Sequence, residues 1–221
     1  CAHHYLAIVD KLQGIAKRMV ENRLAEAIRT GEPMPKGEWF ELADFVRMGK
    51  DANPKIWYRE AAALETRYLS VARFHIPVVV DGSYEIHVMS TRYWGPDQFN
   101  LGLSMAGNGT RFVYDCQAGK VSALSNVKGK GPEDNSTRIR PAGLANDKPH
   151  LMSLFLDRAD GQIACTVRLD DKPYFQWTGP VDDLVGNPLT ASRLELYTWK
   201  TRLDVHGIRF RLKSGEAWLV D

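Results

Sequence analysis

The sequence predicts an all-β protein, a sandwich of two antiparallel sheets, preceded by an N-terminal amphipathic helix. Beyond residue 37, apolar and polar side chains alternate with a period of two, which is typical of strands with one buried face. Turn signals interrupt this alternation at Asp81-Gly82, Asn108-Gly109, Asp160-Gly161 and Asp170-Asp171-Lys172-Pro173. Frequent turns between short alternating runs are typical of antiparallel strands.

Three segments follow from these patterns: a helical segment over 1–31, a linker over 32–37 and a sandwich over 38–221. Two prolines and two glycines fall within residues 31–37 and forbid regular structure there. Over residues 4–29 the apolar side chains recur every three or four positions, as on one face of a helix. That face must be covered by the sandwich, by a second copy or by another domain, so association through helix 4–29 is one expectation.

The strand prediction is clearest in the second half of the chain. Leu151–Asp157, Ile163–Leu169 and Tyr174–Trp177 are separated by two short turns and should form a three-stranded meander. The alternation places Cys165 on the buried face of the middle strand, and Cys116 on a buried face of an earlier strand.

Two other strands can be assigned faces from their alternation. In Ser83–Arg92 we expect Tyr84, Ile86 and Val88 to point inward. Near the end of the chain the same argument places His206 inside, together with Ile208, Phe210 and Leu212.

Composition excludes several classes of protein. Of 221 residues, 44% are hydrophobic and 25% charged, as in ordinary globular proteins rather than disordered chains. The net charge of +2 is too small for a typical nucleic-acid-binding surface, so we expect no nucleic-acid partner. No apolar run approaches the roughly 18 residues of a transmembrane helix, so no transmembrane segment is expected.

The three cysteines, Cys1, Cys116 and Cys165, are too few for a disulfide framework and include no CxxC pair. Cys1 is compatible with lipoprotein-type processing, with a domain boundary or with the start of an ordered region. The compartment therefore stays open, with an extracytoplasmic or cell-envelope location favoured slightly.

Several short motifs resemble one family. The resemblance is to the laminin-G-like, concanavalin A-like modules of planctomycete-type bacterial proteins, and it is carried by Ala72-Arg73-Phe74-His75-Ile76-Pro77, Gly82-Ser83-Tyr84-Glu85-Ile86, Asp170-Asp171-Lys172-Pro173-Tyr174 with Trp177-Thr178-Gly179-Pro180, and Lys213-Ser214-Gly215-Glu216-Ala217. The resemblance covers roughly Trp39 to Val220. It implies a two-sheet jelly roll that serves as an accessory module with a binding role, for which sugars are the candidate ligands. Such architectures host many activities.

Candidate ligand contacts are aromatic side chains that could stack on sugar rings, together with amides and charges that could bind hydroxyls. One group lies in a loop beyond a strand, a second shares one face of a strand opposite Leu194 and Leu196, and a third lies in a polar loop at the rim. These candidates are Tyr93, Trp94, Asp97, Gln98, Tyr197, Trp199, Asn126, Lys128 and Asn135.

No pair of carboxylates occupies alternate positions of one strand, as glycan-cleaving sandwiches require, so we expect no catalytic residues. Calcium needs several converging oxygen ligands, and the scattered Asp97, Asp115, Asp134 and Asp147 suggest no convergence. Calcium is thus possible but unsupported, and no cofactor or metal is expected. The favoured function is non-catalytic carbohydrate recognition, with a protein interaction or assembly role through the helix, or a sugar-processing hydrolase, as alternatives.

Overall fold

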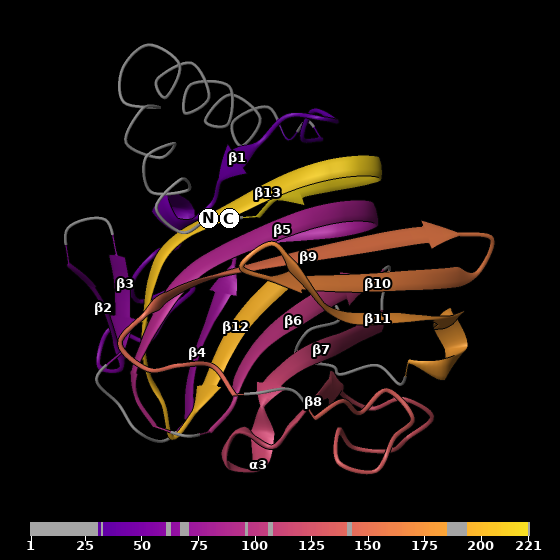
Figure 1. Cartoon of the computed structure of the whole chain (residues 1–221). Helices are drawn as coiled ribbons and strands as arrows, with labels where there is room; N and C mark the ends of the chain where they lie inside the picture. The colour runs from indigo at the N-terminus through magenta and orange to yellow at the C-terminus, as the bar shows by residue number, and fades with distance from the viewer. Residues whose placement is uncertain are drawn as a thin grey trace.

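The computed structural model describes residues 31, 33–60, 63–66, 71–95, 97–105, 108–140, 143–184 and 194–220. Two antiparallel sheets pack face to face in this part of the chain (Figure 1). The predicted two-sheet sandwich is therefore confirmed. The helix predicted over 4–29 lies outside the described residues, so that element and its role in association stay predictions.

The larger sheet has eight strands within the described residues, in the order β11-β10-β9-β5-β13-β3-β2, with β1 paired to β13. These strands are β1 (Phe40–Glu41), β2 (Trp57–Glu60), β3 (Ala63–Thr66), β5 (Val78–Trp94), β9 (Pro149–Ala159), β10 (Gln162–Leu169), β11 (Lys172–Pro180) and β13 (Arg202–Leu219). The long strands β5 and β13 pair along almost their whole length and form the centre of the sheet.

The smaller sheet, as far as the described residues show it, has five strands in the order β4-β12-β6-β7-β8. They are β4 (Val71–Ile76), β6 (Phe99–Met105), β7 (Asn108–Asp115), β8 (Val121–Leu124) and β12 (Leu194–Trp199). Short helical turns lie at η1 (Ala43–Phe45), α3 (Cys116–Gly119) and η2 (Val181–Asp183). In the part of the chain that the structure describes, no helix is long and apolar enough to span a bilayer.

One apolar core fills the space between the sheets. Tyr84, Ile86 and Val88 of β5 are fully buried in it, as the alternation predicts. Leu194 and Leu196 of β12 enter the same core from the smaller sheet. The odd-numbered side chains of β12 consequently project from the outer face of the smaller sheet.

The meander of β9, β10 and β11 is confirmed, and its turns follow the predicted chemistry. Asp160 and Gly161 both have positive φ, as do Asp170 and Asp171. Two-residue turns with positive φ at both positions match the right-handed twist of antiparallel strands, and Asp and Gly tolerate that backbone. Cys165 of β10 lies in the core.

The Asp81-Gly82 turn prediction is wrong, because β5 runs straight through both residues. Gly82 pairs with Gly215 of β13, and a Cβ atom on Gly82 would lie 2.0 Å from the carbonyl oxygen of Ser214. Glycine is required there for the close approach of two strands.

The inward placement of His206 is also wrong. A register shift between Val205 and Gly207 interrupts the pairing of β13 with β5, so that Val205, not His206, enters the core. His206 Nε2 is instead 2.8 Å from Thr91 Oγ1. A bulge adds one residue to a strand and reverses its alternation, which the sequence pattern does not reveal.

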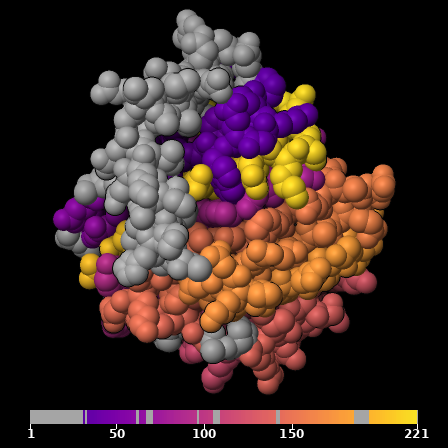
Figure 2. Space-filling model, turned by 45° about the horizontal axis from the view of Figure 1, so that its top comes forward, coloured from indigo at the N-terminus to yellow at the C-terminus, as the bar shows by residue number. Residues whose placement is uncertain are grey.

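Cys116 lies apart from the main core, because β7 ends at Asp115. Its buried neighbours are Val113 and Val121, in a small separate cluster. The residues predicted as a linker, where the structure describes them, lie against β13: Met34 N donates to Ala217 O at 2.7 Å, and Met34 is part of the core. Figure 2 shows this N-terminal stretch lying on β13.

Candidate functional site

Strands β5, β7 and β12 end at one edge of the sandwich, at Trp94, Asp115 and Trp199, and β13 begins there at Arg202. We call this edge the open edge. β5 ends at Trp94, which pairs with Arg202 at the start of β13. β12 ends close by at Trp199, whose amide donates to Gln98 O. Strand ends connected by loops are a common place for binding residues, because a rigid sheet fixes them while the loops stay variable.

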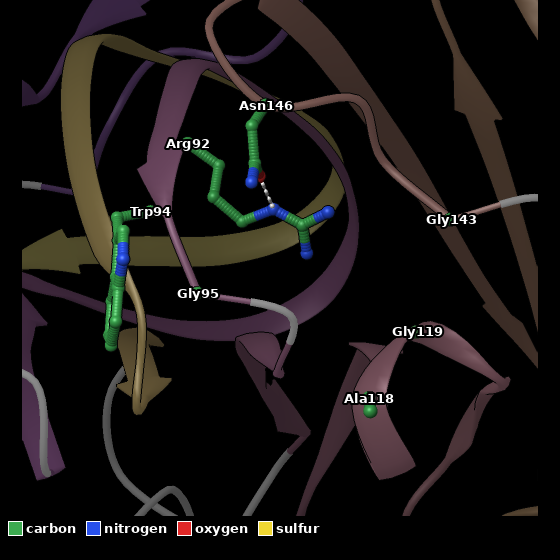
Figure 3. Close-up of a pocket in the computed structure, with 7 residues that line it drawn as sticks. All are labelled: Arg92, Trp94, Gly95, Ala118, Gly119, Gly143 and Asn146. Atoms are coloured by element: carbon green, nitrogen blue, oxygen red, sulfur yellow. Dashed lines mark hydrogen bonds between the residues drawn. The ribbon is translucent and has the colours of Figure 1, made fainter.

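A cavity of about 550 Å³ opens at this edge. Its lining residues are Arg92, Trp94, Gly95, Ala118, Gly119, Gly143 and Asn146. In Figure 3, Trp94 stands on one side, Ala118 and Gly119 stand on the other, and the Arg92 guanidinium lies between them. Four of the seven residues are glycine or alanine, so a ligand could approach the backbone closely. The Trp94 side chain is 54% exposed.

Arg92 forms the fixed floor of this cavity. Its position on β5 continues the inward phase of Val88, so its side chain lies between the sheets and is only 6% exposed. Nη1 donates to Asp115 Oδ2 at 2.9 Å, Nε donates to Asn146 Oδ1 at 2.7 Å, and Nη2 donates to Leu144 O. A guanidinium with partners for all its nitrogens has one well-defined orientation.

The turn opposite Trp94 has an uncommon backbone. Asp115, Gln117 and Ala118 all have left-handed φ values, and Gly119 follows with φ of +81°. This region disfavours residues with a Cβ atom, so surrounding contacts must hold the turn in place. Asp115 supplies such contacts, because its Oδ2 also accepts the Leu144 amide at 2.7 Å.

The four candidates predicted near the end of β5 have different surroundings. Only Trp94 lines the cavity. Tyr93 projects from the opposite side of the strand, with the Arg202 guanidinium 5.1 Å from its ring centroid. Asp97 and Gln98 hold the loop together: the Asp97 side chain accepts the Gln98 amide at 3.0 Å, and its carbonyl accepts Thr201 Oγ1.

The predicted rim residues lie away from the cavity lining. Asn135 is buried, and its amide group stabilises the loop: Nδ2 donates to Leu124 O at 2.8 Å, and Oδ1 accepts from Thr137. The Lys128 side chain is 68% exposed, and its Nζ lies 3.3 Å from Asp183 Oδ2. Asn126 is half-buried with positive φ. In this structure Asn135 serves the fold, so its side chain is not free to meet a ligand.

Tyr197 and Trp199 lie on the outer face of the smaller sheet, because the two leucines of β12 point into the core. Both aromatic side chains are half-buried. The face arrangement expected from the sequence is thus confirmed. Neither residue lines the open-edge cavity.

Sequence reasoning missed Arg92 and Asn146. A signal existed for Arg92, since a charged residue at an inward position near the end of an apolar strand indicates a buried ion pair or a cavity wall. Asn146 had no comparable signal, because its place depends on how the loop before β9 folds back over Arg92.

A pair of carboxylates was also missed. Asp204 of β13 lies directly opposite Glu65 of β3 on the outer face of the larger sheet, near Tyr93. Burial, and then the charge of Glu65, raises the pKa of Asp204 to about 6. The two residues are far apart in the sequence, so no motif within one strand could show this pairing.

A calcium ion would need several oxygen donors in one place. The described ranges contain no group of three or more His, Cys, Asp or Glu side chains that could hold a metal ion. At the open edge, Asp115 is already paired with Arg92.

No family model matches the sequence, and no curated protein matches it. Solved structures with a similar fold include carbohydrate-binding module CBM66 from Bacillus subtilis, at 10% identity and a TM-score of 0.47, over 79% of this chain and 96% of that one. Another is lectin I-B4 from Griffonia simplicifolia, at 10% identity and a TM-score of 0.48, over 79% of this chain and 98% of that one. A putative glycosyl hydrolase from Parabacteroides distasonis has 11% identity and a TM-score of 0.47, over 80% of this chain and 100% of that one. Structural similarity this distant says nothing about function, so the function has to be inferred from the residues of this chain.

Proposed function

We propose that this protein recognises carbohydrate, without catalysis, in the open-edge cavity. The observation that carries the proposal is the Trp94 indole, which is more than half exposed at a cavity with a fixed polar floor. An exposed indole at the rim of a cavity offers a ligand an apolar surface to pack against. The apolar face of a sugar ring is well suited to stack on indole.

Polar groups for sugar hydroxyls lie within the same cavity. Asn146 Oδ1 accepts a hydrogen bond from Arg92 Nε, which fixes the amide orientation and leaves Nδ2 as a donor on an exposed side chain. Ala118, on the other side of the cavity, is also exposed. A few well-placed polar groups beside one apolar surface are typical of small-ligand sites.

The test is a glycan array probed with the wild type and with Trp94→Ala. Tyr93→Ala is a matched control, because it removes a neighbouring exposed aromatic ring from the opposite side of the same strand. We expect Trp94→Ala to lose the wild-type signal on neutral glycans, and Tyr93→Ala to keep it. Silence of the wild type on all glycans, or equal loss in both variants, would contradict binding in this cavity.

A second candidate function, glycoside hydrolysis, is favoured by the opposed Glu65 and Asp204. A carboxyl with a pKa of about 6 beside a second carboxylate is the arrangement that general acid catalysis uses. The measurement is turnover of labelled polysaccharides at substrate excess, by the wild type and Asp204→Asn. Multiple turnovers that Asp204→Asn abolishes would establish hydrolysis and overturn the non-catalytic proposal.

A further inference from the structure

A cluster of charged and aromatic side chains covers part of the outer face of the smaller sheet. We call Arg73, Arg111, Glu195 and Tyr197 the arginine–tyrosine cluster. β12 carries Glu195 and Tyr197, and Tyr197 lies opposite Arg73 of β4. On the other side, Gly102 of β6 lies between Glu195 and Arg111 of β7. Because Gly102 has no side chain, Arg111 can reach across β6.

Both arginines bind the same carboxylate. Glu195 is fully buried, with Oε1 2.6 Å from Arg111 Nε and Oε2 3.2 Å from Arg73 Nε. Within the cluster, two guanidinium groups and one carboxylate leave one net positive charge, while the Asp97 carboxylate also lies within electrostatic range of Tyr197.

Arg111 Nε donates a hydrogen bond to Glu195 Oε1, whereas the contact of Arg73 Nε with Glu195 Oε2 is an ion pair without hydrogen-bond geometry. Arg111 Nη2 is buried without a partner, and among the described residues no hydrogen bond is made by the terminal nitrogens of Arg73 or by Arg111 Nη1. The two side chains are 26% and 17% exposed. Free terminal nitrogens of a guanidinium form a fork that matches the two oxygens of a carboxylate.

The Tyr197 ring completes the cluster. The guanidinium carbons of Arg73 and Arg111 lie 5.4 Å and 5.3 Å from its centroid, within cation–π distance. These contacts fix both arginines in addition to Glu195, so little ordering is needed when a ligand binds. Trp199 lies two positions along the same face, about 7 Å from Tyr197.

We propose that the arginine–tyrosine cluster binds the carboxylate of an acidic sugar. The carboxylate takes the free guanidinium nitrogens, and the sugar ring lies against Tyr197, with Trp199 available to the next sugar. This inference goes beyond the proposed function, because the cluster is separate from the open-edge cavity and selects a charge that the cavity does not. The net positive charge and the planar donor fork favour a carboxylate over a neutral hydroxyl.

Calorimetric titration of the whole chain with trigalacturonate tests this site. The comparison ligands are its methyl ester, which removes the charge, and a sulfated neutral trisaccharide, which changes the anion. We expect trigalacturonate to bind and the ester to bind about 10-fold or more weakly, as loss of a charged hydrogen bond predicts. Preference for the sulfated sugar, or equal binding of acid and ester, would overturn carboxylate recognition.

Three variants locate the site. Arg73→Gln should weaken trigalacturonate binding about 10- to 100-fold, and Arg73→Lys should weaken it less, because it keeps the charge without the fork. Tyr197→Ala leaves the Glu195 ion pairs in place and should also weaken binding. Thermal unfolding of each variant checks that it is folded. Wild-type affinity in both folded Arg73→Gln and Tyr197→Ala, or no trigalacturonate binding by the wild type, overturns the inference.

Trp94→Ala separates this inference from the proposed function. We expect it to bind trigalacturonate as the wild type does. If Trp94→Ala loses trigalacturonate while Arg73→Gln keeps it, the acidic sugar binds in the open-edge cavity; the inference then fails and the proposed function stands. If trigalacturonate binding depends on Arg73 while no glycan depends on Trp94, the proposed function fails and the inference stands.

Discussion

Arg92 Nη1 lies 2.9 Å from Asp115 Oδ2, and this ion pair joins β5 of the larger sheet to the end of β7 in the smaller one. Both side chains are buried. The same pair fixes the floor of the open-edge cavity and, through Leu144, the loop above it. The stability of the fold and the shape of the open-edge cavity therefore both depend on the Arg92–Asp115 ion pair.

Arg92→Met should lower the free energy of unfolding by about 3–5 kcal/mol, because it leaves the Asp115 carboxylate buried without its cation. Denaturant unfolding measures this change. The double variant Arg92→Met/Asp115→Asn should recover part of the loss, since no isolated charge remains and asparagine tolerates the positive φ at position 115. A loss below about 1 kcal/mol in the single variant would show that the pair is not a determinant of stability.

The pH dependence of stability should reflect Asp204. Its pKa in the folded protein is about 6, above the ordinary value of 3.8, so the folded state binds this proton more tightly than the unfolded state. Its contribution is full below pH 3.8 and is lost as the pH rises through about 6. We expect a loss of about 1–3 kcal/mol across this range.

Asp204→Asn isolates that contribution. Burial also raises the pKa of Glu41, to about 7, which makes stability depend on pH in the same direction. Subtracting the unfolding free energies of the variant from those of the wild type removes the Glu41 part, because both proteins contain it. A difference that does not vary between pH 4 and 7 would show that the Asp204 pKa is not raised.

Gly95→Ala should destabilise the protein more than Gly129→Ala. Both glycines have positive φ, which costs alanine about 1–2 kcal/mol. A Cβ on Gly95 would additionally lie 2.1 Å from Lys200 O, whereas a Cβ on Gly129 would have no atom within 4 Å. Thermal unfolding compares the two variants, and equal losses would mean that the loop moves freely at Gly95.

Asn135→Ala should cost about 2 kcal/mol or more, since it leaves buried backbone groups near Leu124 and Thr137 without hydrogen bonds. Lys128→Ala, in the same loop, should change stability by less than about 0.5 kcal/mol, because Lys128 forms an exposed ion pair. Chemical denaturation distinguishes them. If both variants lost less than about 0.5 kcal/mol of unfolding free energy, the Asn135 side chain would not stabilise this loop.

The sequence predicted those parts of the fold that depend on neighbouring residues. Alternation identified the core side chains of β5 and the opposite faces of β12, and the Asp-Gly and Asp-Asp turns identified the meander. It failed where two distant strands meet. The Gly82 crossing and the bulge at His206 depend on how β5 and β13 pair, which neither strand encodes alone.

The site was predicted less well for the same reason. Trp94 was identified because an aromatic residue in a loop is a local signal. Its companions Arg92 and Asn146 meet only when β5 and the loop before β9 come together. The pairing of Asp204 with Glu65 likewise depends on the register between β13 and β3.

The pairing of β5 with β13 also bears on how the chain reaches its native state. Gly82 pairs with Gly215, which lies 133 positions later in the chain, so the middle of the larger sheet depends on contacts between distant segments. Such contacts form slowly, and during synthesis β5 has no permanent neighbour on this side until β13 emerges from the ribosome. The exposed β5 edge is then open to wrong partners, and co-translational chaperones would be expected to act on it during that interval.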